Sequence, residues 1–509
     1  MSSTGRRRAP RERVSARALG IGLTCALLVG GTGAALVLGG AAVPPIGDSG
    51  VAPIGSTEPV ASAELVCPEP AAAGDATVRV SVANIAGFPG QDRGGVATVT
   101  SISDRSTPLI TLDAPGTTGA LDFARSAGPP LVCSGIDGLA PGLVAAQVSR
   151  DESRSGRGLS TSACVTPATS WWYLNGGAEV GQLTRIVVVN PEPAPAEIDI
   201  DVYGPDGPVE LPATRGIVLT SRSQEVFRLD RLIPGVTAGA IHVVARSGRV
   251  AVGVSDSRTD GLIPKGVDWI PAATEPSATV WVPGVSDGDG ARQLRLLAPT
   301  ANAVVSLRVF TASGSFVPTG MSDIDVPQGH VVAVDVAGAM RGEAGTIKVE
   351  SDQPVVAGLK QTYSTADATE ASFTAGAAVM TGPSAVTGLP GGLAGVGRTS
   401  IVVWVTAPDQ PARVRFTILP AVAGGPSPER TGVVVDIPAG RVVPIKVQIP
   451  PLAEWFSAVL TPLSGSVLVA HRVSEISRTG KLVTGYPWVP LRVQVELPAA
   501  QERISVGMP

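Results

Sequence analysis

Residues 184–204, TRIVVVNPEPAPAEIDIDVYG, carry the pattern from which the fold of this chain is predicted, and we call them the deciding stretch. A β-branched run ends at a Pro-containing turn, and a second run follows in which apolar and charged residues alternate. A period of two is typical of a strand with one buried face, so the stretch predicts two successive strands. The apolar positions of the second run are Ile198, Ile200 and Val202, and the charged ones are Glu197, Asp199 and Asp201.

The same pattern returns twice, in residues 292–312 and 398–420, with equivalent positions 108 and 109 residues apart at Asn190, Ala298 and Ala407. A more diverged copy begins at TVRVSVAN, residues 77–84, which ends 106 residues before Asn190. Each copy continues with a further strand and a closing hairpin. About seven strands in about 105 residues is typical of an immunoglobulin-like or fibronectin-like β-sandwich. The chain is therefore predicted to be mainly β, with tandem sandwich modules after one N-terminal transmembrane helix.

The predicted organisation has eight segments. They are a cytoplasmic basic tail (1–18), a transmembrane signal anchor (19–43), a Pro/Gly-rich spacer (44–63), a Cys-containing β module 0 (64–168), β module 1 (169–276), β module 2 (277–378), β module 3 (379–490) and a C-terminal tail (491–509).

Residues 19–43 carry no charged side chain, which is enough apolar length for a helix to cross a bilayer. Six arginines and one glutamate lie in residues 1–18, so the positive-inside rule places the N-terminus in the cytoplasm and the bulk of the chain outside the cell membrane. A cleaved signal peptide is the alternative, because GGAA at 39–42 resembles a cleavage site. Both interpretations export residues 44–509.

The net charge of −4 becomes more negative once the basic N-terminus is set aside. Nucleic-acid binding needs clustered cations, so a nucleic-acid partner is not expected. Low charge and abundant Gly and Pro suit short strands and turns better than long helices.

Three cysteines fall in the predicted module 0, namely Cys67, Cys133 and Cys164. An exported chain can oxidise them, so one disulfide is expected. Spacing alone allows three pairings. Cys67 with Cys164 is favoured because it would join the two ends of the module, which leaves Cys133 free or available to another chain.

Motifs that carry chemistry are scarce. The string GVSDG at 284–288 matches the nucleophile pattern G-x-S-x-G around Ser286, but a strand follows where a helix is needed. GDSG at 47–50 lies in the spacer, and the DGDG turn at 287–290 lacks the distal acid of a calcium loop. The three histidines, His242, His330 and His471, fall in separate modules. No catalytic residue, cofactor or metal site is predicted, and the chain is expected not to be an enzyme.

Seven tryptophans occur in a chain that is poor in aromatic residues. Those at the module starts, Trp171, Trp172 and Trp281, are the candidate ligand-stacking residues, since an aromatic face matches the apolar face of a sugar ring. The alternative is that they pack in module cores or at the joints between modules.

The segment 158–177, GLSTSACVTPATSWWYLNGG, followed by the Asn190-Pro191 turn, resembles an uncharacterised actinobacterial family of membrane-anchored extracellular proteins. The resemblance implies the same topology and brings no activity with it.

Three functions are consistent with these features. The first is a non-enzymatic cell-envelope protein that acts as a scaffold or binds wall polysaccharide or a protein partner. The second is an accessory subunit of an envelope glycan-synthesis or transport complex. The third is a surface hydrolase that uses Ser286.

Overall fold

The computed structural model describes residues 56–70, 76–124, 128–153, 156–237, 239–364, 369–394, 398–421 and 432–497. The chain is mainly β, as the alternating pattern predicts, with 63% of the described residues in strands and 4% in helices. The predicted anchor at 19–43 and the basic tail before it lie outside the described residues. Within the described ranges, no helix is both long and apolar enough to cross a membrane.

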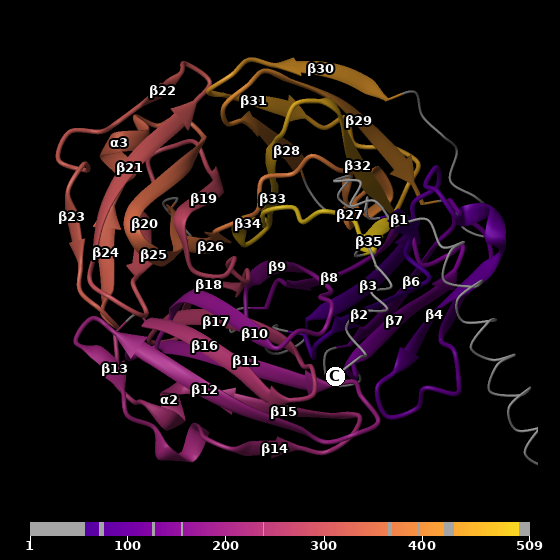
Figure 1. Cartoon of the computed structure of the whole chain (residues 1–509), viewed down its shortest axis with the longest axis horizontal. Coiled ribbons are helices and arrows are strands. Elements are labelled where there is room, and N and C mark those ends of the chain that lie inside the picture. The colour runs from indigo at the N-terminus through magenta and orange to yellow at the C-terminus, as the bar shows by residue number, and fades with distance from the viewer. Residues whose placement is uncertain are drawn as a thin grey trace, which may run out of the picture. The chain divides into compact units, whose positions relative to one another are not determined.

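Module 0 consists of two four-stranded antiparallel sheets, in the orders β2-β7-β4-β5 and β6-β3-β8-β9 (Figure 1). Buried apolar residues of both sheets form one cluster. The strands are β2 (Ser62–Cys67), β3 (Thr77–Asn84), β4 (Gly95–Ser101), β5 (Ile110–Leu112), β6 (Thr118–Ala124), β7 (Leu131–Asp137), β8 (Leu143–Asp151) and β9 (Gly158–Ala163).

Module 1 has a sheet β10-β16-β12-β13, with β14 added at β12, and a sheet β15-β11-β17-β18. The apolar face of the deciding stretch, Ile198, Ile200 and Val202, is buried in the core between them. The elements are β10 (Ser170–Gly176), β11 (Gln182–Asn190), β12 (Ala196–Gly204), β13 (Gly207–Val209), β14 (Ile217–Leu219), β15 (Ser223–Arg228), α2 (Leu229–Leu232), β16 (Gly239–Ser247), β17 (Ala251–Asp260) and β18 (Ile263–Ile270).

Module 2 differs because one long strand, β25 (Gly345–Ser364), pairs in succession with both halves of the module. It joins them into one eight-stranded sheet around a single apolar cluster. The other elements are β19 (Ser277–Val285), β20 (Arg292–Leu297), β21 (Ala303–Thr311), β22 (Ser315–Phe316), β23 (Ile324–Val326), β24 (Val331–Asp335), α3 (Ala337–Met340) and β26 (Thr369–Ala375).

Module 3 returns to two four-stranded sheets, β27-β32-β29-β30 and β31-β28-β33-β34, around their own cluster. The strands are β27 (Ser384–Pro390), β28 (Arg398–Ala407), β29 (Ala412–Pro420), β30 (Val433–Ile437), β31 (Arg441–Lys446), β32 (Trp455–Ser464), β33 (Leu468–Ser477) and β34 (Gly480–Thr484). Short strands β1 (Ser56–Pro59) and β35 (Gln494–Leu497) form a separate pair. Three 3-10 turns complete the described elements, at Gln91–Arg93, Pro212–Thr214 and Gly392–Ala394.

Residues Thr57–Val495 form one compact unit, in which the four modules make a closed cycle of contacts. Each module packs on the next through a small apolar cluster, and module 3 packs on module 0 through a fourth. The last strand of every module takes part in a further set of contacts, because β9, β18, β26 and β34 touch one another in order (Figure 1). We call these four the inner strands.

A buried polar cluster occupies the contact between the inner strands, and each module contributes to it. Asp268 of β18 accepts hydrogen bonds from the Thr484 hydroxyl of β34 at 2.9 Å and from the Thr161 N–H of β9 at 3.4 Å. Glu370 of β26 is paired with Arg157, which immediately precedes β9. We call these five residues the central cluster.

A disulfide, expected from the cysteine content, is present and joins Cys67 to Cys164. It links the end of β2 to the residue after β9, so it ties the two sheets of module 0 together. The third cysteine, Cys133, is fully buried in β7 within the module core. That position leaves it out of reach of another chain.

Candidate functional site

A groove of about 350 Å³ lies at the junction of modules 1 and 2, which is within the size range of small-molecule sites. We call it the junction groove. Module 1 supplies residues of β12, of β13 and of the loop that follows. Module 2 supplies the turn after β20 and the turn after β23. The lining residues are Asp201, Val202, Tyr203, Pro208, Val209, Glu210, Arg215, Pro299, Gln328 and Gly329.

Strand parity brings the polar lining to this face. In β12 the apolar residues enter the core, which turns Asp201 and Tyr203 to the opposite side, where both are partly exposed. The module 2 wall is fixed by a contact between the turns, where His330 Nδ1 lies 3.0 Å from the carbonyl oxygen of Pro205. The wall and the floor of the groove are therefore set by two packed modules.

An aromatic stack supports Tyr203 from within module 1. Trp172 lies 6.2 Å from the Tyr203 ring, with 27° between the ring planes. The other neighbour of Trp172 is His242, stacked at 3.6 Å and 8°. Register explains the arrangement, since Trp172, His242 and Asp201 face one another across β10, β16 and β12. Burial lowers the pKa of His242, which keeps the stacked imidazole neutral at neutral pH.

The groove is polar and carries both signs of charge. The guanidinium of Arg215 forms an ion pair with Asp201, and Glu210 is exposed at the rim. Burial and the nearby Asp201 raise the pKa of Tyr203, so its hydroxyl stays protonated and can donate a hydrogen bond. Carboxylate, guanidinium, amide and phenol groups together offer donors and acceptors around one aromatic ring.

The structure places the three candidate stacking tryptophans in protein contacts. Trp172 is 4% exposed, and its indole N–H donates to Glu275 at 3.1 Å. Trp281 is 7% exposed, packs on Phe310 at the junction of modules 2 and 3, and is covered by Lys348. Trp171 is partly buried against the module 1 core, and its indole N–H donates to a backbone carbonyl. These positions fit the alternative of packing at cores and joints.

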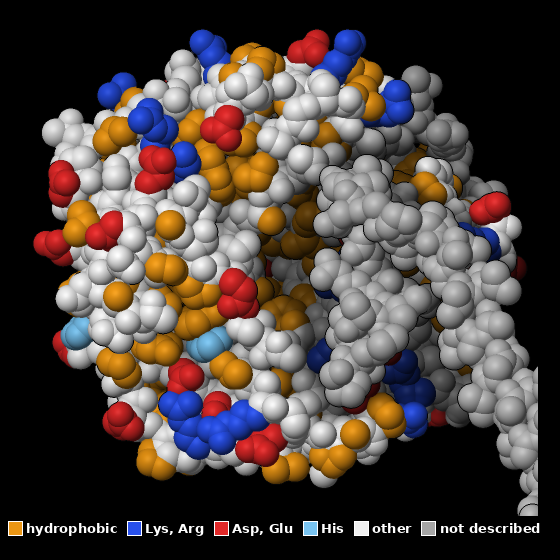
Figure 2. Space-filling view, viewed as in Figure 1, with side chains coloured by type: hydrophobic (Ala, Val, Ile, Leu, Met, Phe, Trp, Pro, Cys, Tyr) orange, Lys and Arg blue, Asp and Glu red, His pale blue; other side chains and the backbone are white. Residues whose placement is uncertain are grey.

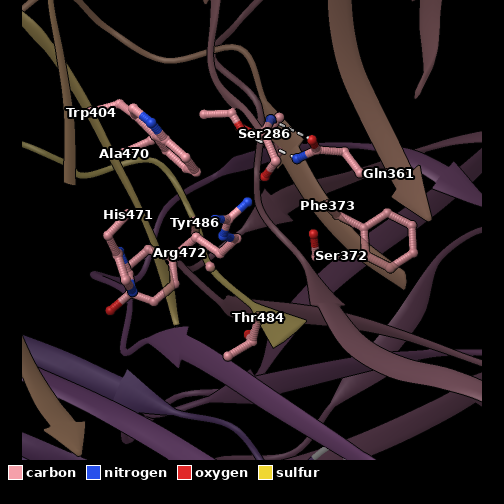
Figure 3. A pocket seen from close by; sticks show the side chains of 13 residues that line it. Ser286, Gln361, Ser372, Phe373, Trp404, Ala470, His471, Arg472, Thr484 and Tyr486 are labelled. Carbon is pink, nitrogen blue, oxygen red and sulfur yellow. Dashed lines mark hydrogen bonds between the residues drawn. The ribbon is translucent and has the colours of Figure 1, made fainter. Parts of the chain in front are cut away.

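Ser286 lines a second, much smaller cavity at the junction of modules 2 and 3, with room for about one water molecule. Figure 3 shows Ser286, Gln361 and Ser372 on one side of it and Trp404 and His471 on the other. The Ser286 side chain is buried, and its hydroxyl accepts a 2.7 Å hydrogen bond from the Tyr363 phenol. In the described part of the chain, its hydrogen bonds involve neither histidine nor carboxylate.

His471 lines the same cavity but is held by other contacts. Its Nδ1 accepts a 3.0 Å hydrogen bond from the indole N–H of Trp488, which leaves Nε2 protonated in the neutral ring. Burial lowers the pKa of His471 to about 4. A ring with Nδ1 engaged and Nε2 carrying its proton has no free lone pair with which to activate a serine.

The DGDG turn is also occupied by internal contacts. Asp287 pairs with Arg472, and the carbonyl oxygens of Gly288 and Gly290 accept hydrogen bonds from Arg292. Across the described ranges, no group of three or more His, Cys, Asp or Glu side chains is arranged to hold a metal ion. The GDSG string at 47–50 lies outside the described residues.

Sequence reasoning missed Tyr203, Arg215 and the module 2 wall of the groove. A signal for Tyr203 was available, because it continues the outward series Glu197, Asp199 and Asp201 in the deciding stretch. No comparable signal exists for Gln328, which reaches the groove only because modules 1 and 2 pack together.

The fold and the groove define a mainly β protein of four modules, with a polar groove at one module junction that a tyrosine helps to line. A family model matches residues 122–447, which include the whole groove, and by that match the chain belongs to the family of unknown function DUF5719. A comparison with curated proteins found no match.

Proposed function

We propose that this chain is a non-enzymatic protein of the cell envelope, made of immunoglobulin-like modules, that binds wall polysaccharide in the junction groove. The observation that carries the proposal is the lining of the groove, which combines Tyr203 with Asp201, Arg215 and Gln328. Sugar rings present an apolar face and a rim of hydroxyl groups. An aromatic ring edged by hydrogen-bonding side chains complements both features.

The groove is preorganised, which favours binding. Trp172, which stacks on His242, also packs beside Tyr203, and the Arg215–Asp201 pair fixes two further polar side chains of the lining. A ligand then orders few side chains when it binds, so less of the interaction energy is lost. The planar guanidinium and carboxylate can each engage two neighbouring hydroxyls.

The location at the envelope rests on two features. The uncharged run at 19–43 with its arginine-rich flank supports a membrane anchor with the modules outside. The Cys67–Cys164 disulfide supports an oxidising compartment. Wall glycan is the polymer that an anchored extracytoplasmic protein meets in quantity.

The test is a pull-down and calorimetric titration of the purified protein with isolated, protein-free wall glycan. We expect saturable binding by the wild-type protein. Tyr203→Ala should weaken that binding about tenfold or more, because it removes an aromatic contact worth about 1.5 kcal/mol. Tyr203→Phe is the matched control, because it keeps the ring and removes only the hydroxyl. No binding by the wild-type protein, or equal binding by Tyr203→Ala, would refute the proposal.

A further inference from the structure

Two cations at the junction of modules 1 and 2, the buried Lys360 and the partly exposed Arg295, form no ion pair with the described residues. Lys360 of β25 is 8% exposed, and its side chain makes no hydrogen bond or ion pair with the described residues. Arg295 of β20 donates one hydrogen bond, from Nη2 to Gln293 at 3.2 Å, and its buried Nε has no partner within those ranges. Burying a cation without a counter-ion is unfavourable, so this arrangement calls for a compensating negative charge.

The carboxylates that act on these two cations already pair with a third cation. Arg258 of β17 lies 3.0 Å from Glu179 and 3.3 Å from Asp256. Asp256 also accepts hydrogen bonds from Gln182 and Thr184, both at 2.7 Å. Three cations therefore face two carboxylates, and the surplus positive charge lies with Lys360 and Arg295.

Arg258 repels the other two cations. Burial, reinforced by repulsion from Arg258, lowers the pKa of Lys360 to about 8. Burial and the same Arg258 also lower the pKa of Arg295. Asp256 and Glu179 raise the pKa of Lys360, and Glu179 raises that of Arg295, but neither carboxylate offsets the effect of burial.

An unpartnered amide adjoins the same place. Asn175 of β10 is 1% exposed, and neither atom of its side-chain amide has a hydrogen-bond partner among the described residues. Its Nδ2 approaches Gly358, where a Cβ would lie 3.4 Å from it, and Gly358 is the register partner of Arg295. A buried amide donor beside two unpaired cations is a typical surrounding for a bound oxyanion.

We propose that Lys360, Arg295, Arg258 and Asn175 form a binding site for an oxyanion of the phosphate type, either free phosphate or a phosphate ester. Arg258 and Arg295 keep part of their surface exposed, so the anion can enter from solvent. None of the four residues lines the junction groove. The site is therefore independent of the proposed glycan binding.

The test measures phosphate binding to the full-length protein at pH 7 by calorimetry and by thermal unfolding, at constant ionic strength set with NaCl. We expect phosphate to raise the melting temperature in proportion to the logarithm of its concentration. Lys360→Met and Arg295→Met should each weaken binding tenfold or more. Lys348→Met is the matched control in the same strand, since Lys348 already pairs with Glu350, and it should bind as the wild type does.

Lys360→Met also separates loss of the site from loss of the fold. Because it removes an unpaired buried charge, it should raise the melting temperature without phosphate while abolishing the rise with phosphate. Equal phosphate effects in wild type and Lys360→Met would overturn the site, as would the absence of any phosphate effect on the wild type.

Two further readouts define the ligand. The first is proton uptake. At about pH 8.5 the bound anion restores the charge of Lys360, so the protein takes up a proton when it binds, and the heat of binding depends on the ionisation enthalpy of the buffer. If the wild-type protein showed no such dependence, Lys360 would not have the proposed role.

The second readout compares the binding of glucose 6-phosphate, inorganic phosphate and glucose, and it identifies whether the bound phosphate group belongs to an ester or to the free anion. Tighter binding of the ester supports a phosphorylated polymer, tighter binding of phosphate supports the free anion, and binding of glucose alone at these residues would overturn the proposal.

Discussion

The guanidinium of Arg157, from module 0, lies 2.7 Å from the carboxylate of Glu370, from module 2, and both side chains are almost completely buried. The contact is an ion pair without hydrogen-bond alignment, because Arg157 Nη2 directs its N–H to the Thr369 carbonyl at 2.9 Å. These residues belong to modules that are not consecutive in the chain. Their ion pair therefore joins modules 0 and 2 directly, in addition to the contacts between consecutive modules.

Removing Arg157 should destabilise the compact unit when Glu370 is ionised. Without its partner the buried carboxylate takes up a proton instead of staying charged. Because the pKa of Glu370 is about 8 in the wild type, Arg157→Met should lower the free energy of unfolding by about 1.4 kcal/mol more at about pH 9 than near pH 6. The loss should shrink near pH 6, where Glu370 is protonated. Urea unfolding at both pH values checks this, with the exposed Arg478→Met as control. A loss that does not change with pH would contradict it.

Glu370 should also make stability depend on pH. Burial raises its pKa to about 8 against the opposing pull of Arg157, and burial raises the pKa of Asp268 in the same cluster. A raised folded-state pKa means that the acid contributes its full stability below its unfolded pKa of about 4.5 and loses it as the pH rises through about 8.

The measurement for this effect is the difference in unfolding free energy between wild type and Glu370→Gln from about pH 5 to 9. Titrations of groups that do not interact with Glu370 cancel in that difference. Wild type should lose stability relative to Glu370→Gln as the pH rises. A difference that stays constant, or changes in the opposite sense, would show that Glu370 titrates normally.

The disulfide should contribute a large share of module 0 stability. Its cysteines are 97 residues apart, and closing a loop of about that length stabilises the fold by roughly 4–5 kcal/mol in the chain-entropy model. The variant with both Cys67→Ser and Cys164→Ser should therefore unfold at a lower urea concentration.

Cys133 should react with a thiol reagent only when the protein unfolds. Burial raises the pKa of its thiol to about 12, so the reactive thiolate is scarce in the native protein. Rapid labelling of Cys133 itself in the native protein, located by peptide mass mapping to separate it from Cys25, would contradict its burial.

Ser286 should not react as a hydrolase nucleophile. Its hydroxyl accepts from Tyr363, and the nearby His471 is bonded to Trp488 through Nδ1. We expect no covalent labelling of native protein by a fluorophosphonate probe, checked by intact mass. Labelling that disappears in Ser286→Ala would establish a nucleophile and remove the case for a purely binding protein.

The sequence predicts what is local and periodic. Alternation places Ile198 and Ile200 in the core, and the spacing of Asn190, Ala298 and Ala407 marks the copies. It does not predict how the modules meet, because the contacts between them have no period. Lys360 alternates with buried Leu359 in β25 like any outward-facing residue, yet module 1 covers it. The groove and the central cluster arise from such contacts, so neither could be found in advance.

Gly266 offers the sharpest test of the contact between the inner strands. It lies in β18 with φ +109°, and a Cβ there would be 2.6 Å from the backbone nitrogen of Ala371 in β26, beside Glu370. Gly266→Ala would therefore force β18 and β26 apart in addition to straining its own backbone. Gly261→Ala is the matched control, because Gly261 also has positive φ, at +59°, with no atom within 4 Å of the added Cβ. We expect Gly261→Ala to cost about 1 kcal/mol from backbone strain and Gly266→Ala about 2 kcal/mol more, measured by urea unfolding. If both variants lost the same stability, modules 1 and 2 would not approach this closely, and the pairing of Arg157 with Glu370 would need another explanation.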